Sequence, residues 1–503
     1  MRKLLMILLL GACVSSVFAG GYITHRMLDG SVLRFKRHAP MRQIKPIDIQ
    51  LSESWDANQV YRIPVVLFSF ADCDFSWENP REYYDRMFNE KGYNLGVGPG
   101  CIADYFRAQS NGLFNVQFDI IGPVKLSTKQ KSSRDENNGR GQISEALRAA
   151  DAEVDFSVYD WDGKGSVPTV ILIYAGYGGN EVSKDITKGC IWPNTDYLFA
   201  KADGVSLRYY SASNELWSNN QSAGIGTLIH EYCHTFGLPD LYPTSGDEYS
   251  VVDEWDLMDG GNYSGDGWCP VNLSSLERER LGWTTPVDLT TSRDVIDMPP
   301  FDQSGVAYRI LNDAYFDEFY LLENRQQVGW DLMLPGHGLV VAHVDYQDYV
   351  WSGNYVNIDP YHHRYDLFHA DGLDFNYYEG LYGTINKHDA DGRSIRLQHT
   401  AYPYTDSSGV IHDALTDTTT PAATLYHARS DGSLFMGKPI TQIQENNGKI
   451  SFHFSDTPDA IAPISSDATP VANYDLQGHL VTTPSRGIYI VRYSDGTTKK
   501  VFR

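Results

Sequence analysis

One short stretch of the sequence, residues 222–242 (SAGIGTLIHEYCHTFGLPDLY), constrains what this chain can fold into more than any other. Apolar residues recur in it at steps of three and four, which predicts one buried face of a helix. His230 and His234 are four residues apart, so both imidazoles leave the same side of that helix. Gly237 can take a left-handed conformation that ends the helix, and Pro239 prevents the helix from resuming. The sequence therefore predicts a helix that presents two histidines, followed by a sharp turn.

The residue types at these positions predict a catalytic metal site. His230 and His234, as neutral imidazoles one helical turn apart, can hold one Zn²⁺, and Asp240 arrives after the turn as a candidate third ligand. A fourth position would then stay open for water or substrate. Glu231 stands beside the first histidine, where it can accept a proton from metal-bound water as a general base. We expect a metal hydrolase with Zn²⁺ as its cofactor.

A second motif, EWDLMDGGNYSGDGW, follows at residues 254–268. Met258 lies there in a tight turn flanked by glycines, and this pattern resembles the Met-turn of metzincin peptidases. The alternative is an ordinary core methionine, because methionine commonly fills gaps in cores. Tyr263 comes five residues after Met258, from where it could reach the oxyanion of a hydrolytic reaction.

Together these motifs resemble the immune inhibitor A family of bacterial secreted zinc metallopeptidases. The resemblance extends over roughly residues 60–454, and the segments that carry it are HEYCHTFGLPDLY, WDLMDGG, RLGW, RIPVVLFSF, IADYFRAQSNGLFNV, VDFSVYDWDGKG and YLLENRQQVGWDLMLPGHGLVVAHVD. It implies a metzincin-like catalytic domain, endopeptidase activity on proteins, zinc and often structural calcium. The family's ligands carry over to His230, His234 and Asp240, and its general base to Glu231.

The length of the chain indicates how many domains it has, and its charge indicates which classes of partner it can bind. A chain of 503 residues exceeds what one core usually supports, so more than one domain is expected. The net charge of −23 makes nucleic acid an improbable partner and leaves proteins or peptides as the expected substrates. We predict an α+β protein divided into a signal peptide (1–19), an N-terminal lead-in or short pro-segment (20–59), a catalytic domain (60–283), a β-rich domain (284–455), a linker (456–470) and a small β tail (471–503).

The first residues have the features of an export signal. Arg2 and Lys3 precede an apolar run, and a small-residue cleavage site ends at Ala19. The run is too short to span a membrane, and no other stretch is long enough. We therefore expect a secreted or cell-surface protein, with a lipid anchor at Cys13 as the alternative. Export permits disulfides among the five remaining cysteines, but the sequence does not assign their pairing.

The catalytic region is expected to alternate strands and helices, which indicates a sheet covered by helices. Strands are predicted at residues 61–70, 115–124 and 168–175, and helices at 80–88, 101–108 and 142–152.

Asp160 and Asp162 begin a loop like that of a calcium site, although Lys164 stands at its fifth position and no glutamate at its twelfth. A solvated turn is the alternative to calcium there.

Two predictions have alternatives: the role of the last residues and the activity of the protein. Residues 471–503 resemble the C-terminal sorting domains of Bacteroidetes type IX secretion substrates, which would make the secretion machinery a partner. A final hairpin of the β-rich domain is the other interpretation. For the activity, the main alternative is an inactive adhesin built on a peptidase fold, and a zinc hydrolase with non-peptide substrates is a third. The presence of Glu231 favours an active enzyme.

Overall fold

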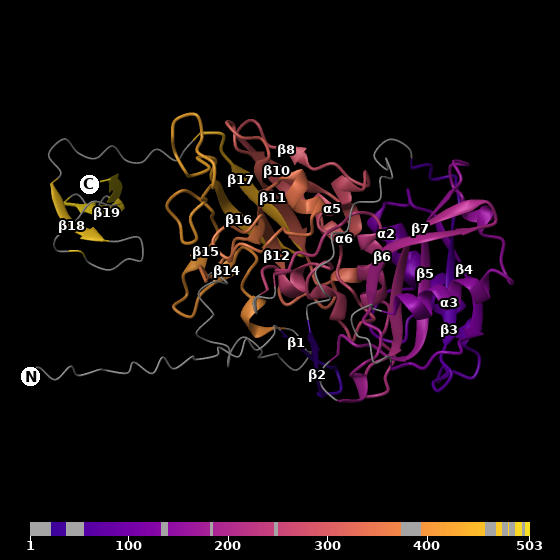
Figure 1. The fold of residues 1–503 in the computed structure, drawn as a ribbon. Coiled ribbons are helices and arrows are strands. Elements are labelled where there is room, and N and C mark those ends of the chain that lie inside the picture. The colour runs from indigo at the N-terminus through magenta and orange to yellow at the C-terminus, as the bar shows by residue number, and fades with distance from the viewer. Residues whose placement is uncertain are drawn as a thin grey trace, which may run out of the picture.

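The computed structural model describes residues 22–36, 55–131, 139–181, 185–245, 250–373, 394–457, 469–474, 481, 488–494 and 498–502. The predicted signal peptide with Cys13, half of the lead-in and most of the linker segment lie outside these residues. The expected mixture of helices and several sheets is confirmed, because the described part of the chain is an α+β protein with few helices (Figure 1). No helix in the described ranges has the length and apolarity needed to cross a bilayer. The five cysteines outside the signal segment are all free thiols.

A five-stranded mixed sheet forms the centre of the N-terminal half, in the order β4-β3-β5-β7-β6. The three strands predicted from sequence are parallel neighbours in it, and β6 pairs with β7 in the antiparallel direction at one edge. The predicted strands and helices of this half are confirmed with bounds shifted by at most two residues. Its elements are β3 (Tyr61–Ser69), α1 (Pro80–Asn89), α2 (Ile102–Gln109), β4 (Val116–Lys125), α3 (Arg140–Ala150), β5 (Ser166–Tyr177), β6 (Asn194–Ala202), β7 (Val205–Leu216) and α4 (Gly226–His234).

The two faces of this sheet are covered by different helices. Along β3, Ile63, Val65 and Leu67 pack with α1, α2 and α4, whereas Val66 and Phe68 pack with α3 on the opposite face. This alternation follows from the two-residue period of a strand, and apolar residues on both faces are typical of a buried parallel strand. The consequence for function is that α4, which carries the histidines, and α3 lie on opposite sides of one sheet.

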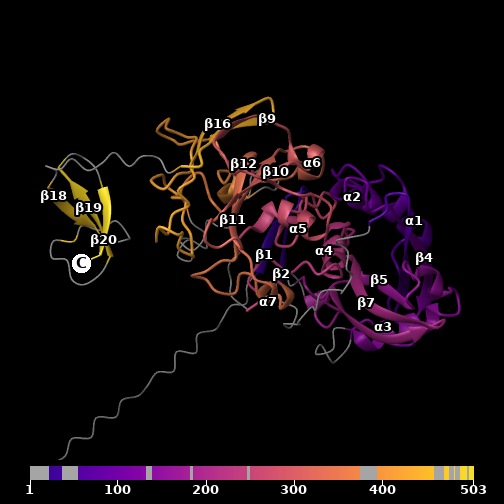
Figure 2. The ribbon, with the colours of Figure 1, turned by 90° about the horizontal axis from the view of Figure 1, so that it is seen from above.

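The C-terminal half is rich in strands (Figure 2). One five-stranded sheet has the order β13-β12-β11-β10-β8, a three-stranded sheet has the order β16-β17-β9, and β14 pairs with β15. The elements are α5 (Ser275–Arg280), β8 (Val287–Asp288), β9 (Arg293–Met298), α6 (Phe301–Ser304), β10 (Ala307–Leu311), β11 (Glu318–Arg325), β12 (Gly338–Asp345), α7 (Asp348–Ser352), β13 (Tyr365–Leu367), β14 (Tyr404–Thr405), β15 (Ile411–His412), β16 (Ile440–Asn446) and β17 (Lys449–Phe454).

The two halves share one hydrophobic core. Phe319 and Leu321 of β11 pack into the same cluster as the helix α4, whereas Tyr320 and Leu322 face the other way, toward the three-stranded sheet. One face of the C-terminal five-stranded sheet therefore continues the core of the N-terminal half. The boundary predicted at residue 283 stays a prediction, and the packing crosses it.

An N-terminal hairpin packs beside the end of β7. The strands β1 (Tyr22–Arg26) and β2 (Val32–Lys36) are antiparallel and form this hairpin. Phe35 of the hairpin packs in one cluster with Trp217 and Tyr263. The hairpin is thus a packed part of the fold.

The C-terminal residues form a small sheet of their own. The strands β18 (Pro470–Tyr474), β19 (Ile488–Tyr493) and β20 (Thr498–Phe502) are antiparallel in that order. Among the described residues, the backbone hydrogen bonds of Thr469, Asn473, Val481 and Ser494 join partners within this sheet and its loops. In both views the sheet stands apart from the C-terminal half (Figures 1 and 2).

Candidate metal centre

The helix α4 is fixed by close contacts at its start. The amide groups of Ile225 and Gly226 both donate to the carbonyl of Gly267, at 2.8 Å each. A Cβ atom added at Gly226 would lie 1.8 Å from the carbonyl oxygen of Asn262, so only glycine allows this approach. Apolar residues of α4 then bury against the sheet, as their spacing predicted. Both the position and the rotation of the helix are therefore set by backbone contacts and core packing.

The turn after α4 has the conformation expected from the sequence. Gly237 has a φ of +84°, in the left-handed region, and its amide donates to the carbonyl of His234 at 2.9 Å. The chain turns back, and Asp240 returns to the histidines. The prediction that Gly237 ends the helix is confirmed.

Three side chains converge on one point at this turn. The Oδ1 atom of Asp240 lies 3.2 Å from Nε2 of His230 and 3.3 Å from Nε2 of His234. All three residues are buried, and among the described residues they form one group in which the ligand atoms lie within 4.8 Å of one another. The structure thus brings together the three ligands proposed from sequence.

The chemistry of this group fits a metal ion. Ligands about 2.0–2.1 Å from a tetrahedral metal are themselves about 3.3–3.4 Å apart, which matches the two oxygen–nitrogen separations. The Oδ1 atom of Asp240 is buried and receives no hydrogen bond. Burial alone would lower the pKa of His234, but the Asp240 carboxylate raises it to about 9. A cation between the three atoms would replace a proton there and satisfy the buried charge.

Backbone carbonyls orient the two imidazoles. Nδ1 of His230 donates to the carbonyl of Leu257 at 3.0 Å, and Nδ1 of His234 donates to the carbonyl of Leu238 at 2.8 Å. With Nδ1 protonated, each Nε2 keeps a lone pair for a metal, which is the usual arrangement around metal-binding histidines. Both rings are therefore held in the tautomer and the orientation that a metal requires.

The predicted Met-turn stabilises the metal site through its backbone. Leu257, whose carbonyl accepts the proton of His230, precedes Met258 directly. The carbonyl of Met258 in turn accepts the amide of Leu241, the residue after Asp240, at 2.9 Å. The Met258 side chain is fully buried in the core around α4. The turn is thus tied both to the first histidine and to the loop that carries Asp240, while a role for the thioether beneath the metal stays a prediction.

Asn354, in the C-terminal half, holds the third ligand. Its Nδ2 donates to Oδ2 of Asp240 at 2.7 Å, and its Oδ1 accepts the backbone amide of Asp240, also at 2.7 Å. The backbone carbonyl of Asn354 accepts a hydrogen bond from Thr244, and Asn357 donates to the carbonyl of Leu241. The segment after α7 therefore forms hydrogen bonds along the loop that carries Asp240, here called the ligand loop. Only Oδ1 of Asp240 is left facing the histidines. No signal near the motif points to Asn354, because 114 residues separate the two partners.

Glu231 is oriented by a strand rather than by its own helix. Thr195 of β6 donates from its hydroxyl to Oε2 of Glu231 at 3.2 Å and also contacts the backbone carbonyl of that residue. Burial raises the pKa of Glu231, and the two neighbouring histidines oppose this rise. Thr195 is a second positioning residue that sequence reasoning missed, because it depends on how β6 packs against α4.

The structure puts two tyrosines near this site, and they differ in their contacts. Tyr263 is buried and stacks on Phe35 of the N-terminal hairpin, with ring centroids 4.2 Å apart, and Asn180 donates to its hydroxyl at 3.5 Å. The hydroxyl of Tyr242, which the sequence analysis did not single out, hydrogen-bonds the Asp240 carboxylate. Burial raises the pKa of Tyr242 well above its usual range, and Asp240 and Glu231 add to the rise. An oxyanion role for Tyr263 stays a prediction, whereas Tyr242 is in direct contact with a ligand.

The candidate calcium loop stabilises itself with its own carboxylates. Asp160 accepts the amide of Gly165 at 2.7 Å, and Asp162 forms an ion pair with Lys164 at 2.9 Å. Lys164 thus supplies the positive charge beside Asp162 that a calcium ion would otherwise supply. Calcium at this turn stays a prediction.

Comparison with known proteins supports the interpretation of this group of residues as a metal site. Residues 53–283 match the family model described as immune inhibitor A peptidase M6, catalytic domain. No curated protein matches the chain. The family match supports a metallopeptidase, and the His230–His234–Asp240 group is compatible with its metal site. Asn354 lies beyond the matched residues, so the site is completed by a part of the chain outside the catalytic-domain match.

Replacement of Asn354 tests whether it positions the metal ligand. Asn354 has a φ of 60°, so glycine removes the side-chain amide without straining the backbone. We expect Asn354→Gly to weaken the affinity for zinc about 10- to 100-fold, as loss of partners behind metal ligands typically does. The measurement is competition for Zn²⁺ with a coloured chelator, beside Asp240→Ala, which should lose stoichiometric metal. Asn447→Gly is the matched control, because Asn447 is exposed and has a φ of 51°. Unchanged zinc affinity in folded Asn354→Gly would contradict this role.

Proposed function

We propose that this protein is a secreted zinc-dependent endopeptidase with a metzincin-like catalytic domain, in which Met258 lies in the Met-turn. The observation that carries the proposal is the convergence of Asp240 Oδ1 on the two Nε2 atoms, with Glu231 on the next position of the helix. The family match over residues 53–283 supports the peptidase part of the proposal. Zinc is favoured because a set of two imidazoles and one carboxylate is typical of its catalytic sites.

In the proposed reaction, the chain's own residues bind the metal and move protons. His230, His234 and Asp240 hold Zn²⁺, which when bound supplies Lewis acidity and a water of lowered pKa. Glu231, held toward the site by Thr195, takes a proton from the attacking water. It then delivers that proton to the nitrogen of the leaving amine, which balances the hydrolysis of one peptide bond.

The inactive adhesin is less well supported than the peptidase. A decayed enzyme would be expected to lose the general base or a ligand, and here all four positions are filled and oriented by neighbouring groups. Glu231 is the residue that favours an enzyme, because it is not one of the proposed ligands and yet is held toward the site by Thr195, as a general base requires.

Glu231→Gln is the direct test of the proposal. The amide has nearly the same shape as the carboxylate but cannot act as a base, and it leaves the three ligands untouched. We expect the rate of peptide cleavage to fall about 10²- to 10⁴-fold while zinc stays bound. The measurement is digestion of a denatured protein mixture with and without chelator, with the new termini read by mass spectrometry and zinc read by elemental analysis.

The control is Glu153→Gln, the same substitution at an exposed position. It should keep wild-type cleavage. Cleavage by Glu231→Gln at the wild-type rate with zinc bound would remove Glu231 from the mechanism. A wild-type protein that binds zinc but cleaves nothing would contradict the endopeptidase proposal as a whole.

We also propose that the C-terminal sheet acts in export rather than in catalysis. The support is the resemblance of residues 471–503 to sorting domains, together with hydrogen bonds of β18–β20 that join partners within their own sheet. A chain ending at residue 463 should keep the melting temperature and the peptidase activity of the full chain. In a host with type IX secretion it should accumulate in the periplasm instead of at the surface. Early melting of the shortened chain, or its delivery to the surface as efficiently as the full chain, would count against this role.

A further inference from the structure

The carboxylate of Asp345, at the end of β12, joins three segments of the C-terminal half. Its Oδ2 atom accepts hydrogen bonds from Nε2 of His362 at 2.6 Å and from Nη1 of Arg364 at 2.7 Å. His427 comes from a third segment, 82 residues further along the chain, and its Nε2 lies 3.2 Å from the same oxygen. The Asp345 side chain has no exposed surface. A buried carboxylate that binds one guanidinium and two imidazoles is held firmly in one place.

The two imidazoles of this cluster are themselves fixed by aromatic rings. His362 stacks on Tyr426, with ring centroids 3.8 Å apart, and His427 stacks on Tyr315 at 3.9 Å. The backbone amides of Tyr426 and His427 both donate to the buried carboxylate of Glu318, at the start of β11. The cluster is therefore built onto the adjacent ends of β11 and β12, two neighbouring strands of the sheet.

The cluster around Asp345 is an ionic anchor rather than a second metal site. Arg364 already supplies a positive charge beside the carboxylate, which a metal ion would have to displace. Within the described ranges, only the group at α4 brings three ligand atoms of His, Cys, Asp or Glu within 4.8 Å of one another.

A chain of hydrogen bonds leads from Asp345 to the ligand loop. Arg364, which binds Asp345, donates its backbone amide to Oδ1 of Asn357 at 2.9 Å. Nδ2 of Asn357 donates to the carbonyl of Leu241, the residue after the third ligand, at 2.7 Å. Asn354, three residues before Asn357, makes the two hydrogen bonds that fix the third ligand itself. Residues 353–364, here called the holding segment, thus touch the ligand loop at one end and Asp345 at the other.

The middle of the holding segment is an exposed turn. The amides of Tyr361 and His362 bond back to Asp359 within the turn, and Tyr361 is 91% exposed. A turn with so little burial adds little to the stability of the segment around it. The far end of the holding segment is therefore fixed mainly where His362 and Arg364 reach Asp345.

We infer that Asp345 is a remote positioning residue of the metal centre, because it holds the holding segment in the place from which Asn354 orients Asp240. This inference rests on the proposed function, since it needs zinc bound by His230, His234 and Asp240. It extends the structure that supports the site to His427, far beyond the residues of the family match.

Asp345→Asn tests the inference, because it removes the charge and keeps the shape of the side chain. We expect it to weaken the zinc affinity of the full chain about 3- to 10-fold, measured by competition for Zn²⁺ with a coloured chelator. The loss is smaller than for Asn354→Gly, because Asp345 lies one step further from the ligand. In the Asn354→Gly background, Asp345→Asn should change zinc affinity less than about twofold, because the holding segment then no longer binds the ligand.

Arg364 provides a second test that leaves Asp345 in place. Arg364→Gln removes the ion pair and should weaken zinc affinity about as much as Asp345→Asn. Arg364→Lys keeps a positive charge beside Asp345 and should retain most of the wild-type affinity. The melting temperature of each metal-free variant shows that it is folded. A lower melting temperature with unchanged zinc affinity would identify the ion pair as purely structural.

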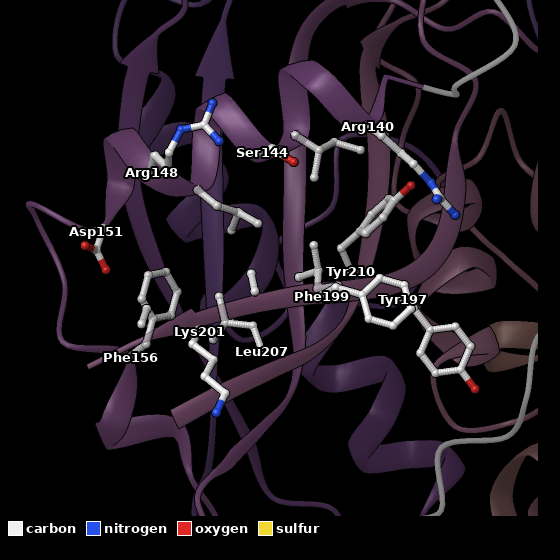
Figure 3. A pocket seen from close by; sticks show the side chains of 15 residues that line it. Arg140, Ser144, Arg148, Asp151, Phe156, Tyr197, Phe199, Lys201, Leu207 and Tyr210 are labelled. Carbon is white, nitrogen blue, oxygen red and sulfur yellow. The ribbon is translucent and has the colours of Figure 1, made fainter. Parts of the chain in front are cut away.

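Two further substitutions of aspartate by asparagine are the controls, and both should keep wild-type zinc affinity. Asp288→Asn breaks an ion pair with Arg309, also 2.7 Å long, in β8 at the edge of the same sheet. Asp151→Asn lies at the pocket between α3 and β6, on the face of the N-terminal sheet that is turned away from α4 (Figure 3). Unchanged zinc affinity in Asp345→Asn and Arg364→Gln, or an equal loss with and without Asn354→Gly, would overturn the role of Asp345 alone. A wild-type chain that binds no zinc would instead refute the proposed function, and this inference with it.

Discussion

The pair of hydrogen bonds between Asn354 and Asp240 is the constraint on which the candidate metal centre depends. A buried carboxylate without a fixed partner would turn toward the nearest donor or take up a proton. Asn354 occupies one carboxylate oxygen and the backbone amide of the same residue, both at 2.7 Å. The other oxygen is left facing the two imidazoles, and their geometry is fixed in turn by the carbonyls of Leu238 and Leu257. The site is therefore preorganised by groups that do not themselves bind the metal.

This arrangement makes the C-terminal half part of the candidate metal centre. Its five-stranded sheet contributes one face to the core around α4 and the other face to the core of the strand-rich half. The segment after α7 is attached to this sheet through Asn357, which accepts hydrogen bonds from the amides of Arg364 and Tyr365. Shared packing of this kind fixes the distance between Asn354 and the ligand loop. A residue outside the region of the family match can thus position a ligand inside it.

The sequence predicts what depends on local spacing and misses what depends on long-range packing. His230, Glu231 and His234 follow from positions on one helix, and Gly237 follows from the conformation that glycine permits. Thr195 and Asn354 reach the site through strand and loop packing, 36 residues and 114 residues away from their partners. Tyr263 was proposed from its spacing to Met258, but that spacing does not reveal that Phe35 stacks on it. The sequence predicts a domain boundary after Trp283, but it does not reveal a core that continues across that boundary.

The central claim is that His230, His234 and Asp240 together bind zinc in the folded chain. Anomalous diffraction from crystals of the full chain, recorded on both sides of the zinc absorption edge, tests it most directly. The account predicts one strong peak about 2.0–2.2 Å from Nε2 of both histidines and from an oxygen of Asp240, with Asn354 still bonded to that carboxylate. A zinc peak at any other residues, or one bound to the two histidines while Asp240 turns away, would contradict it.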